Sequence, residues 1–137
     1  MAEQISKPIP APTLETRPYW EGCHQHELRI QQCAVCAHYQ FYPRLYCSKC
    51  FSDKVEWVKA SGRGKVSTFT IVRRPVSPAF KDDVPYVVAL VTLEEGPTMM
   101  TNIVGCPPEK VEIGMPVEVT FEDWTEEISI ARFRPAA

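Results

Sequence analysis

Two pairs of cysteines constrain this chain more than any other feature. Cys33 and Cys36 form one C-x-x-C motif, and Cys47 and Cys50 form a second one after a gap of ten residues. A C-x-x-C turn places two thiolates on one side of a metal ion, and two facing turns complete a tetrahedral shell of four sulfur ligands. The gap is long enough for a hairpin that brings the second turn opposite the first. The pattern predicts one bound zinc ion, with iron held in the manner of rubredoxin as the chemical rival.

The predicted metal site is structural, because four thiolate ligands leave no open coordination position for water or substrate. Binding of the ion would hold together a segment too small for a core of its own. Cys23 lies outside the pattern, and we expect it to be buried at a helix end beside His24 and His26. A second metal cluster at those three residues is the alternative. Cys106 has no histidine near it in the sequence to act as a base, which disfavours a catalytic nucleophile.

The chain is predicted to be mainly β. Thirteen prolines and six glycines in 137 residues favour short strands joined by turns over long helices. Pro18 is suited to the first position of a short helix, in which Tyr19, Trp20 and Cys23 share one face. A strand is expected from Leu28 into the first cysteine pair, and residues 39–42 are expected to return antiparallel to it.

Beyond the second cysteine pair, the pattern predicts a five-stranded barrel. Val117, Val119 and Phe121 alternate with polar residues, which is the period of a half-buried strand. Residues 85–93 are more continuously apolar, as in a strand covered on both faces. Residues 107–111 are compatible with one helical turn after the third strand, which is the element order of an OB-fold. The five strands are expected at 62–74, 85–93, 97–104, 115–123 and 127–134.

These assignments divide the chain into three parts. Residues 1–17 are proline-rich and without hydrophobic period, and we expect a flexible arm. Residues 18–54 would hold the N-terminal helix and the zinc ribbon, and residues 55–137 the OB-fold. The N-terminus lacks the layout of a signal peptide, and no apolar stretch approaches the length of a membrane helix. We therefore expect a cytoplasmic protein.

The charge of the chain disfavours nucleic-acid binding, which an OB-fold with a zinc ribbon would otherwise suggest. The formal net charge is −2. Residues 61–137 contain eight Lys and Arg against eleven Asp and Glu. A surface that tracks a phosphate backbone is normally basic and carries exposed aromatic residues. Nucleic-acid binding therefore stays the alternative function.

The order of motifs resembles one family of rubredoxin-like zinc ribbons joined to OB-folds, long classed as a domain of unknown function and associated with acyl-CoA enzymes. The likeness covers roughly residues 18–134. One departure is the sequence CSKC at the second cysteine pair, where the family is expected to have a proline after the first cysteine. The motifs that carry the resemblance are YWEG (19–22), LRIQQC (28–33), FYPR (41–44), GRGKV (62–66), PYVVA (85–89), EGP (95–97) and IGMPV (113–117).

The resemblance implies a function through a partner. Members of this family resemble non-catalytic subunits that complete enzymes of the thiolase superfamily, such as thiolases, acyltransferases and aldolases, and some are paired with hydratases. We expect a heterotetramer in which a thiolase-like dimer binds two of these chains. Coenzyme A is a possible shared ligand through the complex.

Two groups of residues are candidates for these contacts. Arg73 and Arg74 form a positive spot suited to a phosphate, although adjacent strand residues point to opposite faces. Phe80, in the loop that follows, is expected to be exposed and to cover the thioester arm of coenzyme A. Four aromatic residues of the helix and ribbon are expected to contact the partner, because a ribbon of this size cannot bury them alone. They are Tyr19, Trp20, Phe41 and Tyr42.

Overall fold

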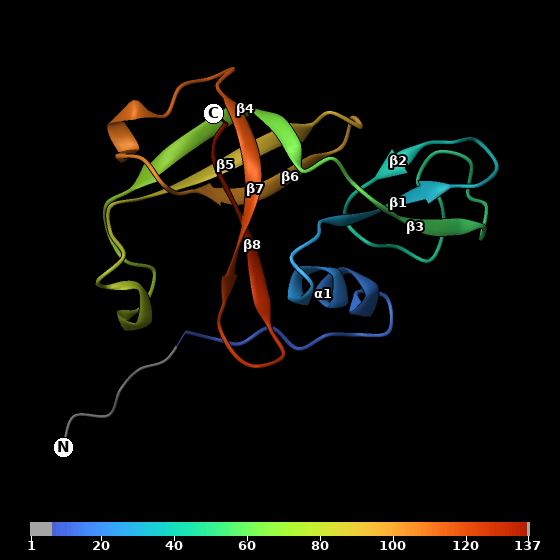
Figure 1. Ribbon diagram of the computed structural model, residues 1–137, viewed down its shortest axis with the longest axis horizontal. Coiled ribbons are helices and arrows are strands. Elements are labelled where there is room, and N and C mark those ends of the chain that lie inside the picture. The colour runs from blue at the N-terminus through green and yellow to red at the C-terminus, as the bar shows by residue number, and fades with distance from the viewer. Residues whose placement is uncertain (1–6, 137) are drawn as a thin grey trace.

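A computed structural model describes residues 7–136 and confirms the predicted mainly β class (Figure 1). One α-helix precedes a three-stranded ribbon sheet, and a closed five-stranded barrel follows. Two single turns of 3-10 helix, η1 (Pro78–Phe80) and η2 (Pro108–Lys110), interrupt the barrel connections. The longer elements are α1 (Arg17–His24), β1 (Arg29–Cys33), β2 (Tyr39–Gln40), β3 (Val55–Lys59), β4 (Arg63–Val72), β5 (Tyr86–Leu93), β6 (Thr98–Ile103), β7 (Pro116–Asp123) and β8 (Ser129–Pro135).

The N-terminal helix forms where the proline predicted it. Pro18 occupies the first turn of α1, where its missing N–H costs no helical hydrogen bond. The expectation of a flexible arm falls partly on residues 1–6, which lie outside the described residues. From Lys7 onward the chain runs to α1 below the end of the β7–β8 hairpin (Figure 1). No helix among residues 7–136 is long and apolar enough to cross a membrane.

The ribbon sheet has the strand order β2-β1-β3, with both outer strands antiparallel to β1. The strand β3 was not predicted from the sequence, and it pairs with the ribbon rather than with the barrel. The division at residue 54 stays a prediction. The return strand is shorter than predicted, because the chain leaves the sheet after Gln40. Phe41 packs instead against Tyr19 of α1, with ring centroids 5.5 Å apart.

The barrel closes in the order β4-β5-β6-β8-β7, as expected for an OB-fold. Strand β4 pairs with β7 at its start and with β5 along its length, so it belongs to both halves of the barrel. A Cβ on Gly64 would lie 2.5 Å from the carbonyl oxygen of Thr92, which explains the glycine at this crowded position. The expectation that β5 is covered on both faces was wrong, because its residues alternate between buried and partly exposed.

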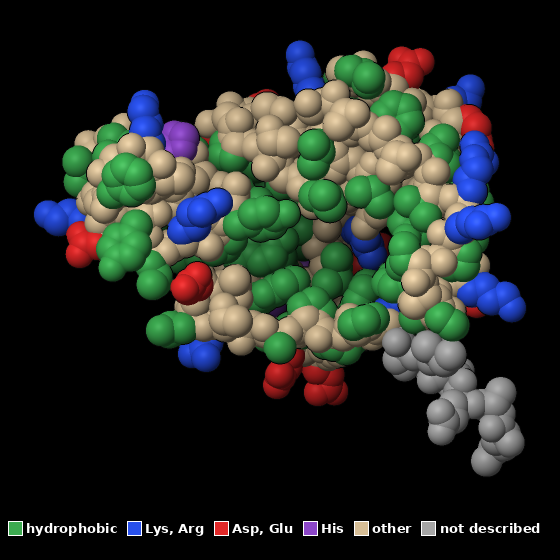
Figure 2. All heavy atoms as spheres, turned by 180° about the vertical axis from the view of Figure 1, so that it is seen from behind, with side chains coloured by type: hydrophobic (Ala, Val, Ile, Leu, Met, Phe, Trp, Pro, Cys, Tyr) green, Lys and Arg blue, Asp and Glu red, His purple; other side chains and the backbone are tan. Residues whose placement is uncertain are grey.

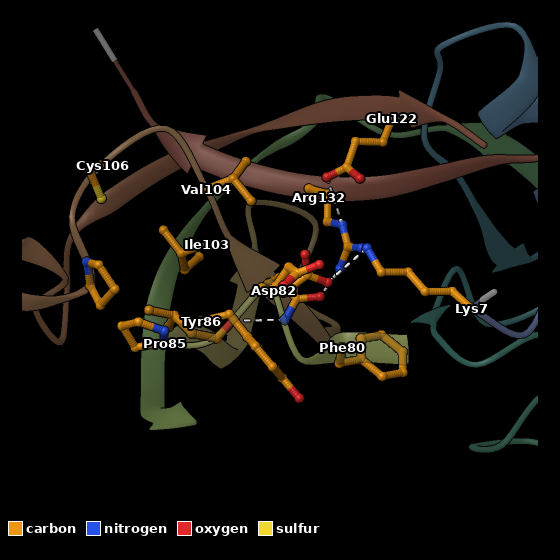
Figure 3. A pocket seen from close by; sticks show the side chains of 14 residues that line it. Lys7, Phe80, Asp82, Pro85, Tyr86, Ile103, Val104, Cys106, Glu122 and Arg132 are labelled. Atoms are coloured by element: carbon orange, nitrogen blue, oxygen red, sulfur yellow. Dashed lines mark hydrogen bonds and ion pairs between the residues drawn. The ribbon is translucent and has the colours of Figure 1, made fainter. Parts of the chain in front are cut away.

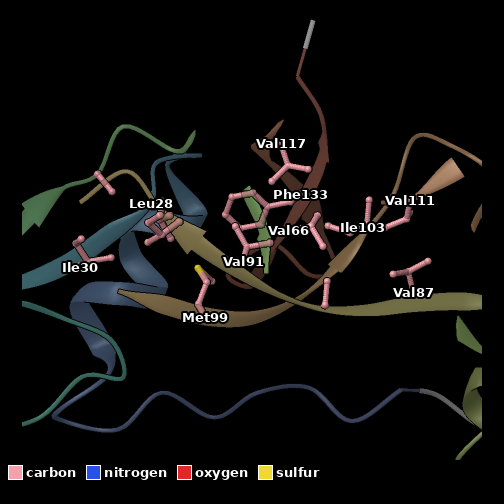
Figure 4. Packing of buried hydrophobic residues seen from close by; sticks show 13 residues of the cluster. Leu28, Ile30, Val66, Val87, Val91, Met99, Ile103, Val111, Val117 and Phe133 are labelled. Atoms are coloured by element: carbon pink, nitrogen blue, oxygen red, sulfur yellow. The ribbon is translucent and has the colours of Figure 1, made fainter. Parts of the chain in front are cut away.

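One hydrophobic core joins the ribbon to the barrel (Figure 4). Leu28 and Ile30, at the start of the ribbon, are buried in the same cluster as Val91 and Phe133 of the barrel. Because β1 also ends in Cys33, this strand connects the core to the cysteine cluster. The position of the ribbon on the barrel is therefore determined by hydrophobic packing.

Two neighbouring methionines of β6 provide a test of this packing. Met99 is 3% exposed and belongs to the core, whereas Met100 is 59% exposed. We expect Met99→Ala to lower the free energy of unfolding by about 2–5 kcal/mol, through lost burial and the cavity left behind. Met100→Ala should change it by less than about 0.5 kcal/mol. Urea denaturation of both variants measures the difference, and equal effects would contradict the assigned core.

Candidate metal centre and partner groove

The four predicted cysteines meet at the far end of the ribbon. Their Sγ atoms all lie within 4.8 Å of one another. Cys33 and Cys50 are 3.5 Å apart between sulfur atoms, and Cys36 and Cys47 are 3.6 Å apart. Ligands 2.3 Å from a tetrahedral zinc ion would have sulfur atoms about 3.8 Å apart. The arrangement therefore fits the ion that the spacing predicts.

The two cysteine turns have the same local geometry. In the first turn the N–H of Cys36 donates to Sγ of Cys33, and in the second the N–H of Cys50 donates to Sγ of Cys47. Each turn ends with a residue in the left-handed region whose N–H bonds the carbonyl of the first cysteine, at Ala37 (φ 64°) and at Phe51 (φ 64°). Each turn thus directs backbone donors at a sulfur atom.

These hydrogen bonds favour thiolates. The N–H of Cys36 lowers the pKa of the Cys33 thiol, and the N–H of Cys50 lowers the pKa of Cys47 to about 6. Cys50 shows the opposite effect. The N–H of Ser52 lowers its pKa, but lost hydration and the neighbouring thiols raise it to about 12. Thiolates this close repel one another, and a cation at their centre removes that cost.

A buried pair of glutamines, which was not predicted, supports the second turn. Gln31 and Gln40 are 4% and 5% exposed, and their side chains are joined by a 2.8 Å hydrogen bond. Gln31 also bonds the backbone of Arg44 in both directions, and Gln40 accepts from the N–H of Ser48. The pair thereby holds the loop that carries the second cysteine motif. Polar residues at inward strand positions were the available signal.

The remaining cysteines and the nearby histidines do not join a metal site among the described residues, where the four ribbon cysteines are the one group of this kind. Cys23 is fully buried as expected, and burial raises its pKa to about 11. His26 bonds Asp123 of β7 through Nε2, at 2.7 Å, and stacks on Phe121. The His26 contacts therefore connect the end of α1 to the barrel.

The four aromatic residues predicted to meet a partner come together between the ribbon and the barrel. Tyr19 contacts Trp20 and Phe41 edge-on, and Phe41 lies 5.1 Å from Tyr42 between ring centroids. With Met100 and other residues of β6 and β8 they line a groove of about 300 Å³. Figure 2 shows hydrophobic side chains gathered in this hollow. Tyr42 is 58% exposed.

The candidate residues for coenzyme A are not brought together. Arg73 and Arg74 are exposed just after β4 and do not line a hollow with Phe80. Phe80 is partly buried rather than exposed, because it lies against Tyr86. It lines a second hollow, a cavity of about 410 Å³ between the 73–84 loop and strands β6 and β8 (Figure 3).

The cations at this cavity come from elsewhere in the chain. Lys7 of the arm and Arg132 of β8 both line it. Arg132 donates through Nε to Glu122, at 3.1 Å, and through Nη1 to Asn102. Sequence reasoning missed these residues, since they are far from the loop in the chain.

The comparisons with known proteins identify the family. Residues 20–56 match the family described as the ChsH2 rubredoxin-like zinc ribbon domain, and residues 57–122 match the ChsH2 C-terminal OB-fold domain. This chain belongs to the ChsH2 zinc ribbon and OB-fold family. The family predicted from the sequence motifs is thus confirmed.

Two curated relatives carry different names. A "DUF35 domain-containing scaffold protein" of Methanothermobacter thermautotrophicus is 37% identical over 82% of this chain and 86% of its own length. A "Probable enoyl-CoA hydratase alpha subunit" of Thermomonospora curvata is 39% identical over 95% of this chain. The chain spans only 40% of the length of that hydratase subunit.

A solved structure also resembles this chain closely. It is titled "Ltp2-ChsH2(DUF35) aldolase", and the matching chain is 39% identical with a TM-score of 0.84. The match covers 93% of this chain and 99% of the other. That relative is thus named within an aldolase of two components, and its fold corresponds to this one over nearly the whole length.

Replacing one ligand tests the metal centre. Cys47 is 1% exposed, so Cys47→Ser removes a ligand that solvent cannot easily replace. We expect metal content to fall from about one ion per chain to well below half, with a marked loss of solubility. Elemental analysis of the purified variants measures this. Cys106→Ser is the matched control and should keep its metal, and a wild-type protein with neither zinc nor iron would contradict the assignment.

Proposed function

We propose that this chain is a non-catalytic accessory subunit that binds one structural zinc ion and assembles with a thiolase-like acyl-CoA enzyme. The observation that carries the proposal is the groove lined by Tyr19, Trp20, Phe41 and Tyr42. Large aromatic residues left partly exposed at a junction between two sheets are typical of interface hot spots. The names of the relatives, a scaffold protein and a hydratase subunit, support a role in an assembly.

The zinc supports this role by stabilising the ribbon side of the groove. Phe41 and Tyr42 leave β2 just before the loop that leads to Cys47. A metal ion at the cysteines would limit the motion of this loop and thus of the two rings. A ligand shell of four thiolates has no position for substrate, so the metal supplies no chemistry to an acyl-CoA.

The partner is expected to be a dimer that binds two of these chains. Most soluble oligomers have closed symmetry, so a two-fold symmetric enzyme presents the same docking surface twice. The resemblance of the solved aldolase component supports a partner from that class. The complex would then be a heterotetramer of two enzyme subunits and two accessory subunits.

The 73–84 loop is proposed to reach the substrate side of the complex. Phe80 already covers the cavity beside β6, and it would lie over the thioester arm of coenzyme A. Arg73 or Arg74, both exposed, would meet a phosphate of the same molecule. Coenzyme A would thus contact this chain through the loop, while the reacting atoms stay in the partner.

Matched tyrosines test the groove. Tyr42 and Tyr46 are 58% and 57% exposed, but only Tyr42 lines the groove. We expect Tyr42→Ala to weaken binding to the co-expressed partner by roughly thirtyfold, as for a hot spot of about 2 kcal/mol. Tyr46→Ala should leave binding unchanged. Calorimetry with the purified partner measures both, and equal affinities for the two variants would move the interface elsewhere.

The same preparations test catalysis. The isolated chain should turn over no acyl-CoA, and the enzyme subunit should gain activity or solubility when the two are co-expressed. Turnover by this chain alone would refute the accessory role.

The loop has its own test within the intact complex. Changing Arg73 and Arg74 together to alanine should raise the KM for the acyl-CoA by roughly tenfold, which is within the range expected for the loss of one charged hydrogen bond of about 1–3 kcal/mol. The turnover number should change little, because neither residue touches the reacting atoms. An unchanged KM in an intact complex would remove the loop from the substrate site.

A further inference from the structure

The side chain of Lys7 lies between two parts of the molecule that are far apart in the sequence. Its Nζ atom is 2.7 Å from Oδ2 of Asp83 in the 73–84 loop. It also lies 5.7 Å from the ring centroid of Phe80 and 5.5 Å from that of Trp124, just beyond β7. One ammonium group thus contacts the loop on one side and the β7–β8 hairpin on the other (Figure 3).

The hairpin side of this contact is well anchored. The guanidinium of Arg132 lies 5.7 Å from the ring centroid of Trp124, on which Lys7 also packs. Arg132 is held in turn by Glu122 and Asn102, and Asn102 donates to the carbonyl of Val87 in β5. Lys7 therefore connects the loop to a network that reaches the barrel strands.

The loop side has few constraints of its own. Among the described residues, its backbone hydrogen bonds are local, such as those from Phe80 to Ser77 and from Asp83 to Phe80, both 3.0 Å. A segment with few long-range hydrogen bonds opens at low cost. The contacts made by Lys7 are therefore a large part of what holds the loop over the cavity.

The arm is suited to position this lysine. Pro8, Pro10 and Pro12 follow it, and proline fixes φ and lowers the entropy lost when an extended segment is held in place. Ile9, Pro10 and Pro12 lie in a hollow together with Trp20 of α1 and with residues at the turn between β7 and β8. The arm is thus attached before it reaches the loop.

We propose that Lys7 is a positioning residue that straps the 73–84 loop to the β7–β8 hairpin and so determines how far the cavity beside Phe80 is open. The strap is a property of this chain alone. Its consequence for an acyl-CoA rests on the function proposed above, since a loop held in place would present Phe80 and the arginine pair in one arrangement.

Hydrogen exchange of the full-length, metal-loaded chain tests the strap. In Lys7→Met, which keeps an unbranched apolar stem, we expect the amides of residues 75–84 to exchange about tenfold faster, from the loss of one partly exposed ion pair and two cation–π contacts. Lys7→Arg should restore protection, because a guanidinium makes the same contacts. Lys81→Met, an exposed lysine in the loop itself, is the matched control and should leave the exchange rates unchanged.

The outcomes separate the strap from other roles. Faster exchange confined to the loop, with rescue by arginine, supports the proposal, as does faster exchange of the wild-type loop at high salt. Unchanged exchange in Lys7→Met would overturn it. Equal acceleration in ribbon peptides would also overturn it, because Lys7 would then stabilise the whole fold.

The intact complex provides a second readout. A rise in the KM for the acyl-CoA in Lys7→Met, at constant turnover number, would link the strap to substrate binding. If the loop exchanges faster but the KM stays the same, the strap stands and the proposed role of the loop in binding coenzyme A fails.

Discussion

The meeting of four cysteine thiols in a small space is the constraint on which the rest of this structure depends. The ribbon has little apolar material to bury, and at its tip Val35, Leu45 and Phe51 remain more than half exposed. Hydrophobic burial alone does not hold such a segment, so the bonds of a metal ion must do so. Because Cys33 ends the strand that begins beside Ile30, the metal centre and the barrel core are connected by one short strand.

This connection produces the surfaces that matter for function. The ribbon and α1 pack on one side of the barrel, and the junction leaves aromatic rings that neither part can cover. The groove and the cavity below the 73–84 loop lie next to each other, and both are lined by Asn102 and Arg132. A partner seated in the groove would therefore contact the residues that also bound the cavity, which offers a physical route between assembly and the loop.

The distribution of chemistry in the chain agrees with an accessory role. The most reactive groups, the ribbon thiols, are arranged to saturate a metal ion rather than to attack a substrate. Cys23 is buried, with its pKa raised by burial, and is thereby kept as an inert thiol. What the molecule offers to the outside is shape, aromatic area and a held loop.

The sequence by itself determined the metal ligands, the short helix and the five barrel strands, because each is encoded by local spacing: two C-x-x-C turns, a proline at a helix start, and alternation with period two. It also indicated the aromatic residues of the groove, since those rings exceed what a small ribbon can bury. Only the tertiary structure decided that β3 joins the ribbon, that Gln31 pairs with Gln40, and that Lys7 meets Asp83. These contacts join residues that no periodic pattern relates. They arise from the way the ribbon, the arm and the barrel pack against a shared core.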